Sequence, residues 1–273
     1  MDRDFIEREY NNRAAVPEHP QMFARWERDS AYVRSSLAGR LDIPYGPDAR
    51  HRLDVFRAPA SRGTLVFIHG GYWRSLDKDV FSWIAAPFVA AGLDVVLPRY
   101  RFVPAASIEE IANDAIDAVN WVFEHGRGHG LALDRVVISG WSAGGHLAAS
   151  VFAAPRERLA FDPARIAGGV AISGLYEFEP LRHFAYNAEF KLDPAAVARL
   201  DLAGKPRTIA APLVVAAGGN ESSEFRRQSR VLAEAWQPQA RPLMVLPGVH
   251  HYGMVDAFAE RGQALHQAAL SFF

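Results

Sequence analysis

Residues 140–144 read Gly-Trp-Ser-Ala-Gly, a G-x-S-x-G pattern that can carry nucleophilic catalysis. The apolar run at residues 136–138 comes before it and a Gly- and Ala-rich segment through Ala154 follows, so it lies between a predicted strand and a predicted helix. At such a turn the hydroxyl of Ser142 would project beyond the sheet, and the glycines would let strand and helix pack closely. We therefore expect Ser142 to be the nucleophile of an acyl-transfer reaction.

A second glycine-rich segment, residues 69–73, reads His-Gly-Gly-Tyr-Trp and follows a nearly continuous apolar run. Acyl transfer needs two backbone N–H donors aimed at the developing oxyanion. Ala143, the residue after the nucleophile, is expected to supply one of them. Gly71 is expected to supply the other, with help from Gly70 or Tyr72. The histidine that opens the segment is expected to brace the loop through hydrogen bonds and not to transfer protons.

A general base is expected late in the chain, after an acid. His250 and His251 both stand directly after a predicted strand, and we favour His251. The acid should follow the predicted strand at residues 213–216. Glu221 has the better position there, because Glu224 falls into the next helix. A carboxylate at this place would hold the tautomer of the histidine and stabilise the imidazolium that forms.

The elements that must position these residues alternate between strands and helices. Short apolar runs predict buried strands at residues 64–68, 93–97, 136–138, 169–172, 213–216 and 243–246. Residues 107–110 form a capping box that opens an amphipathic helix. Residues 51–56 alternate as expected of a half-buried antiparallel strand. The repeated βα units predict the α/β class, with a mostly parallel central sheet and helices on both faces.

The chain length fits one domain, residues 1–273. Residues 1–40 are charged and aromatic, and we expect a helical segment that packs onto the main body. Residues from about 175 to 208 break the βα rhythm, and we expect a small cap over the site.

The composition excludes several kinds of chemistry. No cysteine is present, which excludes disulfides, thiolate catalysis and cysteine-based zinc sites. The 30 basic and 31 acidic residues give a net charge of −1, which predicts no binding to nucleic acid or to an anionic membrane. The charged N-terminus lacks an apolar h-region, and no apolar stretch reaches the length of a membrane span, so we expect a cytoplasmic location.

The segment at residues 69–73 is similar to the HGGYW signature of the α/β-hydrolase-type kynurenine formamidases, or arylformamidases, relatives of the hormone-sensitive-lipase-like esterases. The resemblance extends over most of the chain, with further similar segments at residues 9–13, 99–101, 174–176, 179–181 and 224–229. It implies the α/β-hydrolase fold, with Ser142 as nucleophile, His251 as base and oxyanion donors around Gly71 and Ala143. Eukaryotic members of the family usually carry aspartate as the acid, where this chain has Glu221.

The substrate expected from this resemblance is an arylformamide. Its acyl-enzyme would be a formyl ester, so the acyl side of the site can be small while the leaving-group side must be large and partly aromatic. The residues expected to line the leaving-group side are Tyr72, Trp73, Trp141 and Tyr176. Arg182 and His183, near the cap, are the candidates for binding a substrate carboxylate. We expect no metal or organic cofactor, because the histidines lack a ligand spacing such as H-E-x-x-H. The oligomeric state cannot be read from the sequence.

Three functions agree with these patterns. The first is an amide hydrolase that acts on N-formyl aromatic amines such as N-formylkynurenine. The second is a carboxylesterase of broad specificity for short-chain acyl esters. The third is a non-catalytic module of the same fold, which the complete set of Ser142, Glu221 and His251 disfavours. Comparing the turnover of formamides with that of short-chain esters separates the first two.

Overall fold

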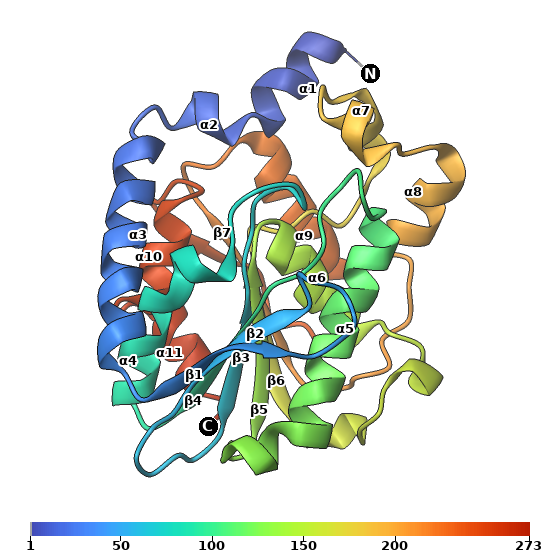
Figure 1. The fold of residues 1–273 in the computed structure, drawn as a ribbon. Helices are drawn as coiled ribbons and strands as arrows, with labels where there is room; N and C mark the ends of the chain where they lie inside the picture. The colour runs from blue at the N-terminus through green and yellow to red at the C-terminus, as the bar shows by residue number, and fades with distance from the viewer. Residues whose placement is uncertain (1) are drawn as a thin grey trace.

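Eight strands form one central sheet in the computed structural model, which describes residues 2–273 (Figure 1). The strand order across the sheet is β1-β2-β4-β3-β5-β6-β7-β8. β2 is antiparallel to both of its neighbours, and all pairs from β4 to β8 are parallel. The strands are β1 (Gly39–Pro44), β2 (Arg52–Phe56), β3 (Thr64–Ile68), β4 (Asp94–Pro98), β5 (Val136–Trp141), β6 (Ile166–Ile172), β7 (Leu213–Gly218) and β8 (Met244–Leu246).

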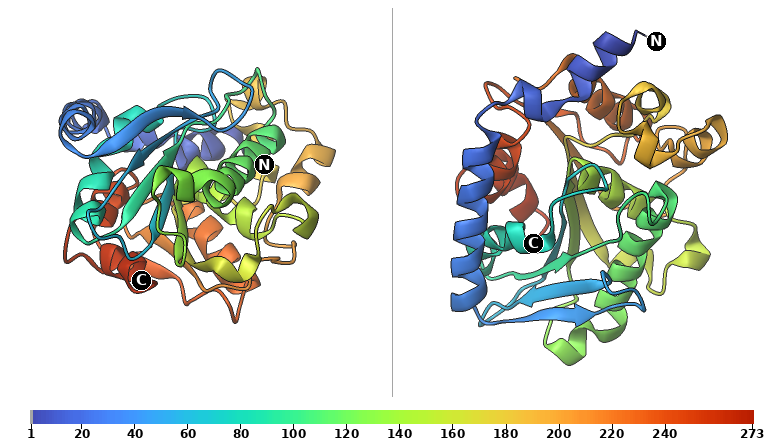
Figure 2. Two further views of the ribbon diagram at one scale, coloured as in Figure 1. Left: turned by 60° about the horizontal axis from the view of Figure 1, so that its bottom comes forward. Right: turned by 45° about the horizontal axis from the view of Figure 1, so that its top comes forward.

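Helices cover both faces of the sheet, as Figures 1 and 2 show. On one face, α5 (Ile108–His125), α6 (Ala143–Phe152) and α9 (Ser223–Ala235) bury one apolar cluster. On the other face, a second cluster is buried by α3 (His19–Ser36), η1 (Lys78–Ile84), α4 (Ala85–Ala90), α10 (Gly253–Ala259) and α11 (Ala264–Leu270). The shorter helices are α1 (Arg3–Tyr10), α2 (Asn12–Ala15), η2 (Gly126–His129), η3 (Arg156–Arg158), η4 (Pro163–Arg165), η5 (Glu179–His183), α7 (Asn187–Phe190) and α8 (Pro194–Leu200). The predicted mostly parallel sheet with helices on both faces is confirmed.

The central strands are buried on both faces, which explains their continuous apolar sequences. Every residue of β3 and β5 is buried, because helices cover both sides of the sheet there. The capping box predicted for α5 is also present. The backbone N–H of Glu110 donates to Ser107 Oγ at 3.2 Å, and the N–H of Ser107 donates to Glu110 Oε2 at 2.7 Å. These bonds satisfy two backbone donors at the start of the helix.

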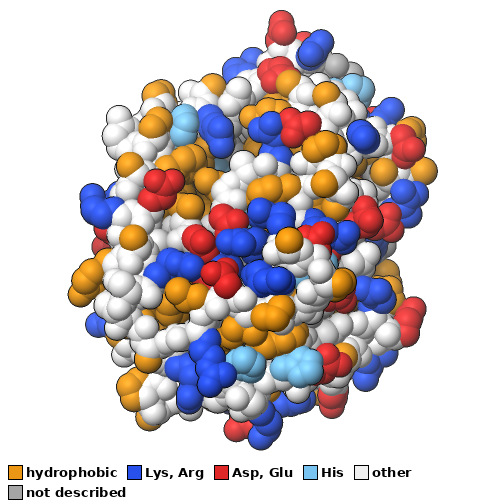
Figure 3. Space-filling view, viewed as in Figure 1, with side chains coloured by type: hydrophobic (Ala, Val, Ile, Leu, Met, Phe, Trp, Pro, Cys, Tyr) orange, Lys and Arg blue, Asp and Glu red, His pale blue; other side chains and the backbone are white. Residues whose placement is uncertain are grey.

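β2 is antiparallel as predicted, but the expectation that it is half-buried is wrong. Four of its five residues are buried, including Asp54, whose carboxylate receives ion pairs from Lys78 and Arg34. Lys78 Nζ lies 2.8 Å from Asp54, 2.8 Å from Asp42 and 2.6 Å from Asp79. These three carboxylates are close enough together to hold a metal ion, but Lys78, Arg34 and Arg99 already form ion pairs with them. Figure 3 shows acidic and basic side chains side by side across the middle of this face.

The N-terminal segment forms helices, as expected, and it also lies over one end of the sheet. α3 runs along one side of the sheet, while α1 and α2 extend over the ends of the strands (Figures 1 and 2). η5, α7 and α8 lie within residues 175–208, beside α1 in Figure 1. Among residues 2–273, no helix combines the length and the apolar character that a membrane span requires.

Candidate active site

Ser142 occupies the sharp turn between β5 and α6. Its backbone has φ 57° and ψ −122°, a conformation that residues other than glycine rarely adopt. The turn is held because the N–H of Ser142 donates to the carbonyl oxygen of Ile172 at 2.8 Å. A Cβ at Gly140 would lie 2.0 Å from the carbonyl oxygen of Gly144, so only glycine fits where strand and helix cross. Ser142 is thereby held at the N-terminus of α6, in the wall of a pocket.

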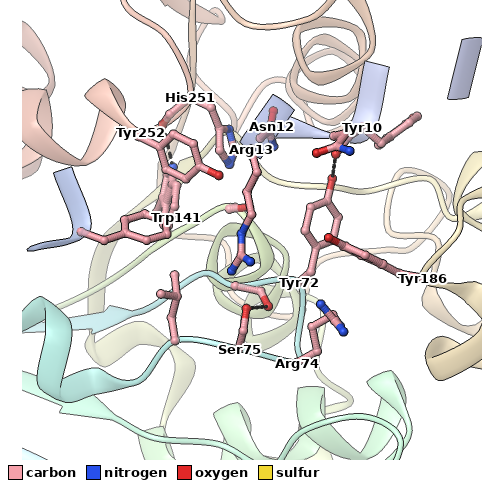
Figure 4. A pocket seen from close by; sticks show the side chains of 15 residues that line it. Tyr10, Asn12, Arg13, Tyr72, Arg74, Ser75, Trp141, Tyr186, His251 and Tyr252 are labelled. Carbon is pink, nitrogen blue, oxygen red and sulfur yellow. Dashed lines mark hydrogen bonds between the residues drawn. The ribbon is translucent and has the colours of Figure 1, made fainter. Parts of the chain in front are cut away.

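His251 and Glu221 lie side by side at the carboxyl end of the sheet. Glu221 follows β7, His251 follows β8, and the Nδ1–H of His251 donates to Glu221 Oε1 at 2.5 Å. Both residues are buried, with exposed fractions of 3% for His251 and 5% for Glu221. This bond leaves Nε2 of His251 free to accept a proton, and His251 lines the same pocket as Ser142 (Figure 4).

Two further groups hold the second oxygen of Glu221. Ser173 Oγ donates to Glu221 Oε2 at 2.9 Å, and the backbone N–H of Gly218 donates to it at 2.7 Å. Ser173 directly follows β6 and has φ 50°. The sequence analysis missed this serine, although its place at the carboxyl end of a predicted central strand was a usable signal. With both carboxylate oxygens bonded, Glu221 is fixed in position for His251.

His250 takes a different direction from its neighbour. Its Nδ1 accepts the N–H of Gly253 at 3.1 Å, and its Nε2 lies 3.8 Å from Oε1 of Glu18, the residue before α3. Of the two adjacent histidines, His251 is therefore the one that meets Glu221 and the pocket.

Trp141 supports the position of His251. Its Nε1–H donates to the carbonyl oxygen of His251 at 3.0 Å, and the two ring centroids lie 4.9 Å apart. The ring of Phe225 packs against the imidazole from another side, with centroids 4.6 Å apart. Trp141 also contributes to the pocket lining, as expected. It therefore serves both as a pocket wall and as a brace for the histidine.

The loop after β3 has an unusual backbone. Gly71 has φ 121°, and the next two residues, Tyr72 and Trp73, have φ 52° and 54°. The carbonyl oxygen of Gly71 accepts the N–H groups of Arg74 and Ser75 at 3.1 and 3.0 Å. A Cβ at Gly71 would lie only 1.9 Å from the carbonyl oxygen of Ser75, which requires glycine there. The loop is thus folded tightly back at the pocket.

Backbone N–H groups remain available where an oxyanion would form. Within residues 2–273, the N–H groups of Gly71, Tyr72 and Ala143 donate to no acceptor. Gly71 lines the pocket, and Ala143 is the first residue of the helix that Ser142 precedes. Gly70 is not in the pocket wall, and a Cβ at this position would meet the ring of Trp141 at 2.6 Å. The arrangement offers Gly71 and Ala143 as donors, and the part expected of Gly70 in the oxyanion hole stays a prediction.

The pocket beside Ser142 and His251 has about 450 Å³ of empty space, which includes space open to solvent, and aromatic rings border much of it. The expected Tyr72 and Trp141 belong to its lining, which also includes Tyr10, Phe23, Tyr186 and Tyr252 (Figure 4). α1 and α2 supply four consecutive residues of the wall, residues 10–13, whereas Tyr186 alone reaches it from the expected cap. The N-terminal segment therefore covers the site more than residues 175–208 do.

Trp73 and Tyr176 do not line this pocket, contrary to expectation. Both are fully buried in the core. Trp73 packs between Phe178 and His146, with ring centroids 5.5 and 5.3 Å away. Tyr72 lies at the pocket and Trp73 lies beneath it in the core, with their ring centroids 6.3 Å apart. Of the two adjacent aromatic residues, only Tyr72 can contact a ligand.

Arg182 and His183 also lie away from the pocket lining. Both face Glu179: Arg182 donates to its carboxylate at 2.7 and 2.9 Å, and His183 Nε2 lies 3.4 Å from it. Their charges are therefore engaged at the surface, and neither belongs to the described wall.

His69 braces the loop, as expected. Its Nδ1–H donates to the carbonyl oxygen of Gly70 at 2.7 Å, and its ring stacks on Tyr100 with centroids 4.3 Å apart. Burial lowers the pKa of His69 to about 4, so the ring is neutral near pH 7. His69 is not in the pocket wall, and a structural role accounts for its contacts.

Residues 65–246 match the family described as alpha/beta hydrolase fold, which is more than half of the chain. The chain belongs to the α/β-hydrolase family. The fold expected from the sequence is confirmed, and the protein is a hydrolase.

Among curated proteins, the chain is similar to two kynurenine formamidases. It is 29% identical to that of Danio rerio over 72% of this chain and 68% of the relative. It is 26% identical to that of Salmo salar over 84% of this chain and 80% of the relative. The resemblance to the kynurenine formamidases is therefore confirmed across most of the α/β-hydrolase chain.

Solved structures share the same architecture. A protein provisionally named a thioesterase, from Silicibacter sp. tm1040, has a TM-score of 0.88 and 29% identity, covering 97% of this chain and 98% of that one. Esterase B from Lactobacillus rhamnosis has a TM-score of 0.72 and 18% identity, with 96% and 95% covered. At that lower identity the esterase shows the common fold alone.

Proposed function

We propose that this hydrolase cleaves the amide bond of arylformamide-type substrates such as N-formylkynurenine through a covalent acyl-enzyme on Ser142. The observation that supports this most is the 2.5 Å bond between His251 Nδ1 and Glu221 Oε1, in a histidine that shares a pocket wall with Ser142. A histidine held by a carboxylate on one side presents its other nitrogen as a general base.

In the first half of the reaction, Nε2 of His251 takes the proton from Ser142 as Oγ attacks the formyl carbon. The carbonyl oxygen becomes an oxyanion, which the N–H groups of Gly71 and Ala143 stabilise. The C–N bond then breaks, and the leaving arylamine takes the proton from Nε2. Ser142 is left as a formyl ester.

In the second half, water attacks the formyl ester and gives one proton to Nε2 of His251. The tetrahedral intermediate collapses, the bond to Oγ breaks, and Ser142 recovers its proton from Nε2. Formate is released, and Glu221 stabilises the imidazolium in both halves without taking its proton.

The aromatic residues of the pocket wall agree with an aromatic leaving group. Its wall contains several aromatic rings, and such rings bind a planar arylamine by stacking and edge contacts. The relatives named kynurenine formamidase, at 26–29% identity over most of the chain, favour the same substrate class.

A second candidate is the hydrolysis of short-chain acyl esters. The relative provisionally named a thioesterase, at 29% identity over 97% of this chain, favours an ester-type bond. The same serine, histidine and oxyanion donors would serve either bond, because both reactions pass through an acyl-enzyme, which differs only in the acyl group that it carries.

Assays of the purified wild type on N-formylkynurenine and on a short-chain aryl ester separate the two. The proposed function predicts a higher kcat/KM for the formamide, and Ser142→Ala should abolish both activities. Ester turnover without formamide turnover would reject the formamidase assignment in favour of an esterase. The cytoplasmic location and the lack of nucleic-acid binding stay predictions.

A further inference from the structure

The pocket is positively charged beyond what its catalytic groups require. Its lining contains two arginines, Arg13 and Arg74, and no aspartate or glutamate. Arg74 is neutralised, because it donates to both carboxylate oxygens of Glu189, at 2.9 and 2.5 Å, and its guanidinium lies over the ring of Tyr186. Arg13 has no such partner: among residues 2–273, no carboxylate forms an ion pair with it. One positive charge in the wall is therefore uncompensated.

Arg13 is directed into the pocket that Ser142 and His251 also line. Figure 4 shows its side chain extending from α2 into the middle of the pocket, between Tyr252 and Tyr72. Burial raises the pKa of Tyr252 to about 12, a rise that the nearby Arg13 guanidinium opposes. The phenol thus stays neutral and leaves the positive charge of Arg13 in place.

Asn12 supplies a second, independent sign that a ligand belongs here. It is only 6% exposed and lies in the pocket wall, yet its Nδ2 donates to no acceptor. A buried donor without a partner destabilises the unliganded protein, so such donors are usually satisfied by a ligand or water. Asn12 and Arg13 are adjacent on α2, but their side chains leave the helix in different directions in Figure 4, so each marks the pocket separately.

α2 is fixed before any ligand arrives. Asn11 caps it by accepting the N–H of Ala14 at 3.1 Å. The preceding residue, Tyr10, accepts a bond from Tyr72 through its carbonyl oxygen at 2.6 Å and donates its hydroxyl to Glu224 at 2.7 Å. These contacts tie the start of α2 to the loop after β3 and to α9, which fixes its position at the pocket.

We propose that Arg13 binds a carboxylate on the leaving-group side of the substrate and makes the enzyme selective for aryl substrates that carry a carboxylate. A guanidinium offers two parallel N–H donors to a carboxylate, which gives both affinity and orientation. The inference deepens the proposed function and rests on it for the reaction, but the anion site itself can be tested by binding alone.

The test compares wild type with Arg13→Gln on two matched pairs of compounds. Binding of meta-aminobenzoate and meta-aminobenzamide is measured by titration calorimetry, and hydrolysis of the two corresponding N-formyl compounds gives kcat/KM. We expect Arg13→Gln to lower the affinity for meta-aminobenzoate by about 10- to 100-fold, as for a lost charge-assisted bond. The kcat/KM for its N-formyl derivative should fall by a similar factor. For the uncharged amide, the affinity and kcat/KM should change by less than about threefold. Arg182→Gln removes an equal charge outside the pocket, and it should leave the affinity and kcat/KM for both compounds unchanged.

The outcomes distinguish the inference from the proposed function. Equal effects of Arg13→Gln on both compounds, or selectivity lost in Arg182→Gln instead, would overturn the anion site even if formamides are hydrolysed. Carboxylate binding that depends on Arg13, without hydrolysis of either formamide, would support the anion site and reject the formamidase activity. A restored preference in Arg13→Lys would confirm that positive charge at this position is what selects the substrate.

Discussion

Glu221 and His251 stand 30 residues apart in the chain, yet their side chains meet at 2.5 Å at the carboxyl end of the sheet. Glu221 occupies the place where an aspartate is usual among the eukaryotic kynurenine formamidases. The longer side chain is accommodated because Ser173 and the N–H of Gly218 hold its second oxygen. Glu221 is therefore held by hydrogen bonds to both of its carboxylate oxygens. The effects of its charge and of its side-chain length can be tested separately.

Removing the charge of Glu221 should disable the base. Glu221→Gln places an amide beside Nδ1 of His251, which no longer favours the required tautomer or stabilises the imidazolium. We expect kcat to fall by about 10³- to 10⁴-fold while the circular dichroism spectrum is unchanged. Glu234→Gln, on the exposed face of α9, is the matched control. Retention of wild-type kcat in Glu221→Gln would rule this acid out.

Shortening the acid should have a smaller effect. Glu221→Asp keeps the charge but withdraws the carboxylate by one methylene group, so it cannot keep His251, Ser173 and Gly218 all at bonding distance. We expect a fall in kcat of about 10- to 100-fold, typical of a misplaced catalytic group. A variant as active as wild type would show that the loop after β7 relaxes to follow the shorter side chain.

The loop after β3 should not tolerate a side chain at position 71. Gly71→Ala would bring a Cβ within 1.9 Å of the carbonyl oxygen of Ser75 and would force the loop to move. We expect kcat to fall by at least about 100-fold through the lost donor. The strain should also lower the free energy of unfolding by about 1–3 kcal/mol.

The control for Gly71→Ala is the same substitution at a glycine whose Cβ would meet no other atom. No atom lies within 4 Å of a Cβ built on Gly128. Gly128→Ala should therefore keep both kcat and the melting temperature of the wild type. Equal behaviour of the two variants would contradict the role given to the loop.

Some of these features could be predicted from the sequence because they depend on short segments. The turn at Ser142 needs only a strand, two glycines and a helix, all within residues 136–154. Glu221 and His251 were expected from their places after predicted strands. Pocket residues that depend on backbone direction were not predictable in this way. Trp73 follows Tyr72 in the sequence but lies in the core, packed between Phe178 and His146, whereas Tyr72 lines the pocket.

The covering of the site by α1 and α2 could not be predicted from local patterns either. It depends on the contact between Tyr10 and Glu224, which are 214 residues apart. The residue types in this segment indicated helices that pack on the body, but nothing in their spacing gave the place where they dock. Arg13 was missed for the same reason, and Arg182 was considered instead because of its place near the expected cap.

The contact of Tyr10 gives a test of this covering segment. Tyr10→Phe removes the hydroxyl that donates to Glu224 at 2.7 Å and accepts from Gln228 at 3.1 Å. We expect the free energy of unfolding to fall by about 1–3 kcal/mol, because a buried carboxylate loses a donor. KM should rise more than kcat falls, since Tyr10 borders the pocket but is not a proposed reacting group. Tyr32→Phe, at a position 73% exposed, should change neither quantity.

Two buried histidines should make the protein less stable in mild acid. Burial lowers the pKa of His69 to about 4 and that of His146 to about 3, from an ordinary value of 6.5. Below pH 6.5 the unfolded chain takes up these protons while the folded protein does not. The free energy of unfolding should therefore fall by about 1.4 kcal/mol per histidine for each pH unit below 6.5, until the folded pKa is reached.

Denaturant unfolding at several pH values between 4 and 7 measures this slope. His146 packs against Trp73 and Phe178, so His146→Phe replaces it with another ring that carries no proton. The variant should show a shallower dependence on pH over this range. An identical slope in wild type and variant would mean that His146 is not held neutral.

The most direct test of the proposed chemistry is to trap the nucleophile with an aryl alkylphosphonate and to locate the adduct by peptide mass spectrometry. The account predicts a single phosphonylated residue, Ser142, with no labelling of Ser142→Ala and much slower labelling of His251→Gln. A label on a different residue, or full labelling of Ser142→Ala, would contradict the assignment of Ser142 as the nucleophile.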